Sequence, residues 1–145
     1  GELDYLIVDL PPGTSDIHIT LSQNFPVTGT VIVTTPQKVS TNDVEKGISM
    51  YNQEQTKVPI IGLIENMSYF KDDNDKKHYI FGKDGGKKLC DQFSIDLIGQ
   101  IPIENKISEA GDSGYPIILK ENYISDVFKT ISQNIARKIA INNSK

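Results

Sequence analysis

A carboxylate near the N-terminus stands between a run of apolar residues and a proline-rich turn. The run covers residues 5–8, the carboxylate is Asp9, and the turn contains Pro11 and Gly13. A carboxylate at the tip of a buried strand can hold Mg²⁺, usually through water, beside nucleotide phosphates. Gly13 lets a backbone N–H approach a terminal phosphate because it has no Cβ. The segment predicts a phosphate-sensing loop; the alternative is an aspartate that only caps a turn.

Three further apolar runs have the length of buried strands. They cover residues 31–33, 60–64 and 97–101. Together with the first run they alternate with helical patterns, which is typical of a parallel sheet built from strand–helix–strand units. The sequence therefore predicts one α/β domain.

Apolar residues recur every three or four positions between and after these runs, which predicts helices. The expected helices cover about 40–53, 85–93 and 125–141. The first is expected to be capped within residues 40–43, and the last by Asn122 or Ser125. The strongly polar segment 71–79 is interpreted as a surface loop or hairpin.

Ligands bind beyond the carboxyl ends of the strands in open α/β sheets. The loops that follow the four expected strands are residues 9–13, 34–37, 65–68 and 102–105. We expect these loops to meet at one edge of the sheet, with Asp9 and the other three strand ends around a shared cleft.

Composition excludes several classes of protein. The 145 residues suffice for one domain with a hydrophobic core, and a net charge of −4 with scattered lysines argues against nucleic-acid binding. No run approaches the roughly 20 apolar residues of a membrane span. The single cysteine, Cys90, fits a reducing compartment, so a cytoplasmic protein is expected. The chain enters its first apolar run without a preceding turn, which suggests a start in the middle of a domain.

Several blocks resemble one family. Asp9-Leu10-Pro11-Pro12-Gly13-Thr14-x-Asp16 is similar to the switch II signature of the Mrp/ApbC proteins, which belong to the MinD/ParA-like P-loop ATPases. The similarity continues in order through residues 26–37, 62–70, 78–82, 85–89, 99–102 and 109–114. It spans roughly residues 1 to 119, and the collinear blocks are specific as a set.

The resemblance implies a three-layer P-loop NTPase-like fold and a dimeric ATPase that carries iron–sulfur clusters to recipient proteins. It implies Asp9 as the catalytic Walker B carboxylate, holding Mg²⁺ through water, with Pro11 and Gly13 near the ATP phosphates. It places Asn66 on the adenine base, with Pro102 and Ile103 along its other side. Without the resemblance, the favoured interpretation of Asn66 is a turn residue, because asparagine is common after strands.

Two features depart from the family pattern. No Gly-x-x-x-x-Gly-Lys-Ser/Thr loop is present, so residues 1–145 are expected to be the C-terminal part of a single domain that binds ATP weakly or not at all alone. The Cys-x-x-Cys pair that many members carry is replaced within residues 71–78, so no cluster ligands are expected. Cys90 is interpreted as a small core residue. No arginine finger is evident, because Arg137 is the only arginine.

Two alternatives stay open at this point. One is a MinD/ParA-type positioning ATPase that binds a membrane or nucleoid; the other is a non-catalytic interaction module derived from the same fold.

Overall fold

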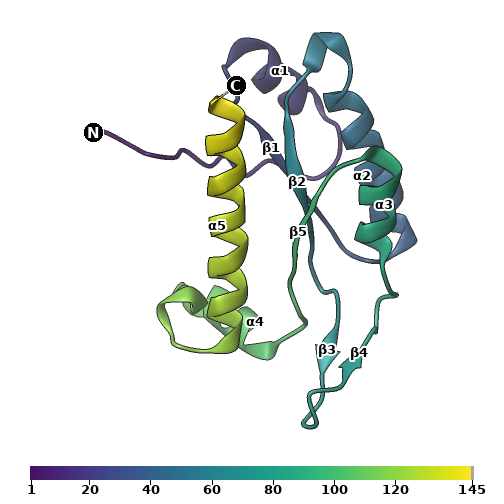
Figure 1. Cartoon of the computed structure of the whole chain (residues 1–145), viewed down its shortest axis with the longest axis vertical. Helices are drawn as coiled ribbons and strands as arrows, with labels where there is room; N and C mark the ends of the chain where they lie inside the picture. The colour runs from purple at the N-terminus through teal and green to yellow at the C-terminus, as the bar shows by residue number, and fades with distance from the viewer. Residues whose placement is uncertain (145) are drawn as a thin grey trace.

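A parallel sheet lies between two layers of helices in the computed structural model, which describes residues 1–144 (Figure 1). Its strands within that part of the chain are β1 (Thr30–Thr34), β2 (Ile60–Glu65) and β5 (Leu97–Gln100), in the order β1-β2-β5. Both pairs are parallel, with Val33 beside Ile64 and Ile64 beside Gly99. The central strand β2 is the most deeply buried, which explains its continuous apolar run.

Helices α2 (Lys38–Tyr51) and α3 (Gly85–Phe93) cover one face of the sheet. They bury a cluster of apolar side chains: Ile32, Ile48, Met50, Tyr51, Val58, Leu63, Leu89 and Cys90. Both helices were predicted, but the predicted cap of α2 is wrong. Its N-cap is Gln37, and the Ser40 hydroxyl instead bonds the Thr34 hydroxyl at 2.9 Å.

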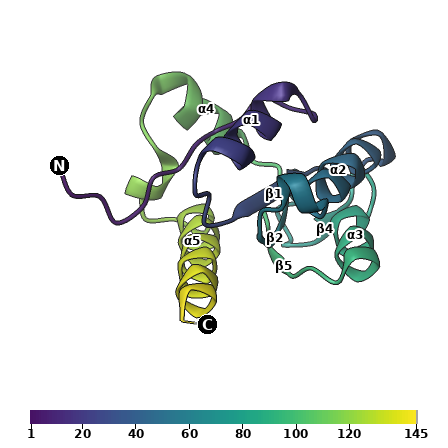
Figure 2. The same ribbon diagram turned by 90° about the horizontal axis from the view of Figure 1, so that it is seen from above.

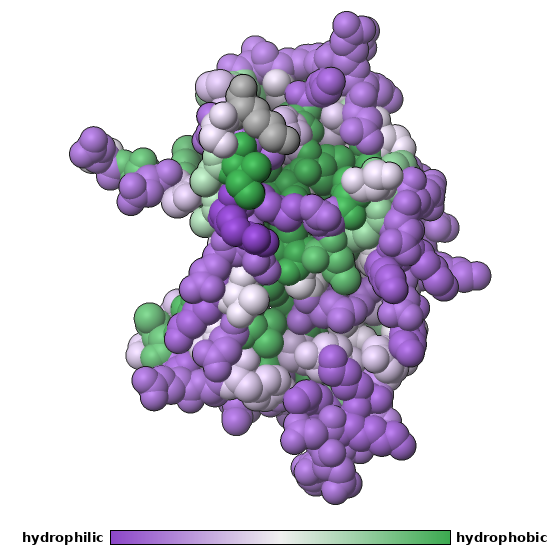
Figure 3. Space-filling model, viewed as in Figure 1, coloured by the Kyte–Doolittle hydropathy of each residue, from purple (hydrophilic) through white to green (hydrophobic). Residues whose placement is uncertain are grey.

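Helix α5 (Tyr123–Asn143) covers the other face, so the predicted three-layer arrangement is confirmed (Figure 2). The buried residues on this side are Ile61, Ile64, Ile98, Ile101 and Ile131. Asn122 caps α5, because its Oδ1 accepts a hydrogen bond from Ser125 N at 3.0 Å. Apolar residues show through between α5 and the helices of the opposite layer (Figure 3).

Two helices were not predicted. Helix α1 (Asp16–Asn24) contacts the short 3-10 turn η1 (Glu54–Thr56), which precedes β2. Helix α4 (Asn105–Ser113) is followed by a second 3-10 turn, η2 (Ile117–Leu119), and both pack with α5 around the buried Ile124. Helix α1 therefore lies toward the amino end of the sheet, and α4 follows its carboxyl end (Figure 1).

The polar segment forms the expected hairpin. Strands β3 (Phe70–Lys71) and β4 (Lys77–His78) pair antiparallel and project from the carboxyl end of the sheet (Figure 1). A parallel bridge between Phe70 and Ile103 ties the base of the hairpin to the chain that follows β5.

The predicted strand at residues 5–8 is wrong for this structure. These residues are extended but unpaired, and Ile7 is 89% exposed. The segment runs out from the body of the molecule (Figures 1 and 2). An apolar run becomes a buried strand only when neighbouring strands pair with it and helices cover it. Within residues 1–144, β1 pairs with β2 alone.

Candidate functional site

Three of the four predicted loops meet at the carboxyl end of the sheet. Asn66 N donates to Thr34 O at 2.7 Å, which joins the loops after β1 and β2. Ile101 N donates to Glu65 O at 2.9 Å, and Ser68 N donates back to Ile101 O at 2.9 Å. The backbone itself therefore holds the segment around Asn66 beside the segment that begins at Ile101.

Asn66 is half-buried and stands at the start of a constrained turn. Its Oδ1 accepts a hydrogen bond from Met67 N at 2.9 Å, and Met67 has a φ of 54°. A left-handed conformation at a non-glycine residue is costly, and such residues often occur at functional sites. Asn66 thus shapes its own turn. Its amide keeps Nδ2 hydrogens and a second Oδ1 lone pair that can meet the edge of a base.

The two residues expected on the other side of a base differ in accessibility. Pro102 is fully buried, whereas Ile103 is half-buried. Ile103 N donates to Tyr69 O at 2.7 Å, so this residue is fixed beside the strand that leads into the hairpin. Apolar atoms for contact with a ligand come from Ile103 in this conformation.

Across residues 1–144, Asp9, Pro11 and Gly13 show no polar contact with this group. All three are exposed, and no hydrogen bond or ion pair joins them to the other loops within the described part of the chain. Gly13 has a φ of 95°, which few other residues adopt without strain. The structure therefore ties the turn containing Asn66 to the segment that contains Pro102 and Ile103, and the described residues show no such tie to the N-terminal segment.

A magnesium site is not formed by these residues alone. Across residues 1–144 there is no group of three or more histidine, cysteine or acidic side chains arranged to hold a metal. Asp9 offers one exposed carboxylate. A single carboxylate suits Mg²⁺ only where phosphate oxygens and waters complete the coordination.

Glu65, the last residue of β2, was not singled out from the sequence. It is only 1% exposed, and its Oε1 accepts hydrogen bonds from Ser68 Oγ at 2.7 Å and Gln100 Nε2 at 2.9 Å. Its Oε2 accepts one from Gly86 N at 2.6 Å, at the start of α3. The only signal in the sequence is an acidic residue closing an otherwise apolar strand, a pattern that surface turns share.

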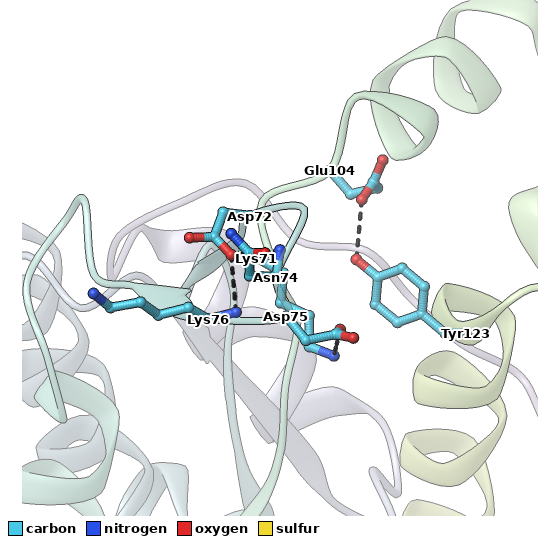
Figure 4. A network of polar contacts seen from close by, with 7 residues as sticks. All are labelled: Lys71, Asp72, Asn74, Asp75, Lys76, Glu104 and Tyr123. Atoms are coloured by element: carbon cyan, nitrogen blue, oxygen red, sulfur yellow. Dashed lines mark hydrogen bonds and ion pairs between the residues drawn. The ribbon is translucent and has the colours of Figure 1, made fainter.

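The hairpin uses its acidic residues internally. The Asp72 carboxylate bonds His78 Nε2 at 2.7 Å and accepts from the backbone N–H groups of Asn74 and Lys76. The hydrogen bond with His78 is the main cause that lowers the pKa of Asp72, and the Lys76 amide adds to it. Lys71 pairs with Asp75 at 2.8 Å (Figure 4). The Asp72 and Asp75 carboxylates are thus engaged within the hairpin itself, as expected for a solvated charged hairpin.

Next to the hairpin, Tyr123 connects the start of α5 to the loop before α4. Its hydroxyl donates to Glu104 Oε2 at 3.0 Å (Figure 4). Partial burial raises the pKa of Tyr123 to about 12, and the Glu104 carboxylate contributes. Lys71 Nζ lies 5.4 Å from the centre of the Tyr123 ring, so a hairpin side chain also contacts Tyr123.

Cys90 lies in the core, as predicted. It is a free thiol, 5% exposed, on the face of α3 that packs against the sheet. Burial is the main cause that raises its pKa to about 11. Cluster ligation requires accessible thiolates, so this residue does not fit an iron–sulfur ligand.

Within residues 1–144, no helix is both long enough and apolar enough to cross a membrane.

Known proteins similar to this chain are named for carrying or transferring iron–sulfur clusters. The chain is 40% identical over 142 residues to an iron–sulfur cluster carrier protein of Aquifex aeolicus, covering 96% of this chain and 38% of that protein. It is 43% identical over 122 residues to the iron–sulfur cluster transfer protein NUBPL of Mus musculus, covering 83% of this chain and 38% of the relative. The chain thus spans well under half the length of these relatives.

Solved structures agree on the fold. A nucleotide-binding protein from Archaeoglobus fulgidus, solved with ADP, superposes with a TM-score of 0.67 at 43% identity. The match covers 79% of this chain and 46% of that one. The cell division ATPase MinD of Pyrococcus furiosus superposes with a TM-score of 0.56 over 74% of this chain and 41% of that one. At 19% identity, MinD supports the fold alone.

A ParA family model described as NUBPL iron-transfer P-loop NTPase matches residues 1–140, nearly the whole chain. Since the match has this extent and relatives of about 40% identity cover the same residues, the chain belongs to the family of NUBPL-type iron-transfer P-loop NTPases.

Proposed function

We propose that this chain is the C-terminal part of an ATP-binding, ATP-hydrolysing iron–sulfur cluster carrier. The observation that carries the proposal is that backbone hydrogen bonds tie the turn containing Asn66 to the segment 101–103, at the carboxyl end of a sheet of this family. An iron–sulfur carrier and an iron–sulfur transfer protein among the relatives support the cargo, and the ADP complex of a 43% identical protein supports the nucleotide.

The proposal gives this chain the base-binding half of the site. Asn66 offers a donor and an acceptor to the edge of adenine, Ile103 offers an apolar side chain, and Pro102 supports the loop from beneath. Asp9 is assigned to Mg²⁺ through water, with Pro11 and Gly13 near the terminal phosphate. Mg²⁺ in such sites neutralises charge that develops on the phosphates.

The N-terminal segment joins this site only in a longer protein. The strand expected at residues 5–8 requires a pairing partner, which the proposal assigns to a preceding part of the domain that also carries the phosphate-binding loop. In that setting Asp9 ends a covered strand and faces the nucleotide. Residues 1–145 alone lack the backbone cradle and the lysine of that loop, so they are proposed to be inactive as an ATPase.

The iron–sulfur cluster is cargo in this proposal. The buried thiol of Cys90 offers it no ligand. Ligands come from outside this chain, and the protein acts as a cytoplasmic homodimer that passes the cluster to recipient proteins. Nucleotide state is proposed to alter the segment around Pro11 and so the dimer face.

Calorimetry tests the nucleotide half of the proposal. Mg-ATP is titrated into the full-length protein and, separately, into residues 1–145. We expect micromolar affinity in the full-length protein and none in the shorter chain. Micromolar affinity in residues 1–145 would refute the assignment of the phosphate site to a preceding segment.

Anaerobic reconstitution tests the cargo half. The full-length protein is incubated with iron and sulfide, desalted, and examined by visible absorption and by sedimentation. A brown, dimeric product is expected. A colourless, iron-free product would remove the carrier function while leaving nucleotide binding intact.

A further inference from the structure

The carboxyl group of Glu65 joins three separate elements at the end of the sheet. Glu65 belongs to β2. Its carboxyl group accepts one hydrogen bond from the side-chain amide of Gln100, at the end of β5, and another from Gly86 N, in the first turn of α3. With Ser68 as a third donor, both oxygens are occupied inside the protein. A single buried side chain therefore fixes the relative positions of β2, β5 and α3.

Helix α3 depends on this carboxyl group for its N-terminus. The helix follows Asp84, whose side chain makes no capping hydrogen bond. Glu65 takes the place of that cap by accepting from Gly86 N. The approach is close: a Cβ at Gly86 would lie 3.0 Å from Glu65 Oε2 and 2.9 Å from Leu63 Cδ2. Glycine at this position lets the helix end reach the carboxylate.

The backbone of Glu65 is part of the same connection. Its carbonyl accepts hydrogen bonds from Ile101 N at 2.9 Å and from Ser68 Oγ at 2.8 Å. Between Glu65 and Ser68 lie Asn66 and the strained Met67. Both ends of the Asn66 turn are thus tied to the segment that leads into Pro102, and a strained turn keeps its geometry only when its surroundings fix it.

Core packing does not explain a glutamate at this position. The neighbouring core is apolar, and burying a carboxyl group is costly compared with an apolar side chain of similar volume. Its three hydrogen bonds offset that cost only while all three are made. The residue next to it along the chain is Asn66, so the geometry of this network is transmitted to that side chain first.

We propose that Glu65 is a positioning residue of the base site, holding Asn66 and Ile103 at the separation that a base requires. This inference rests on the proposed function, which assigns the base to these two residues, and adds the residue that sets their geometry. Glu65 itself touches no ligand.

The test compares two substitutions in the full-length protein. Glu65→Gln keeps the size, and the Ser68 hydroxyl and Gln100 amide can both turn to accept from the new amide. Glu65→Leu removes all three acceptor contacts. Gln100→Leu, at a half-buried position, removes one of them and serves as the milder variant if Glu65→Leu does not fold. Glu109→Leu on the exposed face of α4 is the matched control.

Calorimetry measures affinity for Mg-ATP and for inorganic triphosphate, which has no base. Glu65→Leu is expected to raise the Kd for ATP about tenfold and leave that for triphosphate unchanged. Glu65→Gln and the control are expected to bind both ligands as tightly as wild type, and Gln100→Leu to bind ATP about threefold more weakly. Equal loss for both ligands, or no loss in folded Glu65→Leu or Gln100→Leu, would overturn the proposal.

Hydrogen exchange separates this inference from the proposed function. Folded Glu65→Leu or Gln100→Leu is expected to exchange faster at residues 66–69 and 101–103, with the helix interiors of α2 and α5 unchanged. If the wild-type protein binds neither ligand, the proposed function fails. The positioning role is judged separately: it is overturned if protection at residues 66–69 is the same in both folded variants as in the wild-type protein.

Discussion

The Tyr123 hydroxyl donates a hydrogen bond to the Glu104 carboxylate at 3.0 Å, joining the start of α5 to the residue before α4. The two residues are 19 positions apart. This contact fixes where the C-terminal helix begins relative to the loop that carries Pro102 and Ile103.

Replacing Tyr123 with phenylalanine removes that bond and keeps the ring. We expect the free energy of unfolding to fall by about 0.5–1 kcal/mol, because a partly exposed hydrogen bond is worth little net of its water partners. Urea denaturation measures the change. Tyr115→Phe is the control, since Tyr115 is half exposed and its hydroxyl has no bonding partner within residues 1–144. Equal stability of Tyr123→Phe and wild type would contradict the role given to this contact.

Much of the fold could be predicted because its signals are local. The apolar spacing of Val44, Ile48 and Tyr51 marked α2, and the run at 60–64 marked the central strand. Helix α1 was missed because its β-branched residues Ile17, Ile19 and Thr20 have modest helix propensity. Helix α4 contains Gly111 and two serines, and it is stabilised by packing on η2 and α5 rather than by its own sequence.

The site was predictable only in part, for a related reason. Parallel strands bring their carboxyl ends together, so the order of strands and loops along the chain is enough to place Asn66 and Ile103 at one edge of the sheet. Whether residues 5–8 form a paired strand could not be predicted in the same way, because an apolar run does not specify its pairing partner. Glu65 was missed because burial of a carboxylate depends on Gly86 and Gln100, 21 and 35 residues away.

The Cys90 thiol should react slowly in the folded protein. Its pKa is raised to about 11, so below that pH the native thiol is protonated as well as buried. We expect iodoacetamide at pH 9 to label Cys90 at least tenfold faster in urea than in buffer. An unfolded thiol ionises near pH 8.5–9. Burial of the protonated thiol therefore contributes to the free energy of unfolding below about pH 9, and this contribution is lost as pH rises from about 9 to 11. Equal labelling rates would contradict the buried position.

The Asp72–His78 pair should weaken in acid. The pKa of Asp72 is lowered by the hydrogen bond with His78, so the stabilisation is present above the usual carboxyl pKa and is lost as pH falls through the lower folded value. Exchange of the Lys76 amide, which donates to Asp72, reports on this loss. We expect its protection at pH 5 to be reduced in Asp72→Asn, with Asp43→Asn, at an exposed position of α2, as the control. Unchanged protection in Asp72→Asn would contradict this account of the hairpin.

The core facing α2 and α3 should depend strongly on Leu63. Its side chain is 0% exposed and lies in the central strand. Leu63→Ala is expected to reduce the free energy of unfolding by about 2–5 kcal/mol, the usual cost of a cavity in a packed core. Leu119→Ala, at a position 62% exposed, should change it by less than about 0.5 kcal/mol. Similar losses in the two variants, measured by urea denaturation, would show that this cluster is not the main core.

The most direct test of the base site is calorimetry of Asn66→Ala in the full-length protein, with Mg-ATP and inorganic triphosphate as ligands. If Asn66 reads the base, the substitution raises the Kd for ATP about tenfold and leaves that for triphosphate unchanged. An ATP affinity equal to that of the wild-type protein would contradict the placement of the base at this end of the sheet.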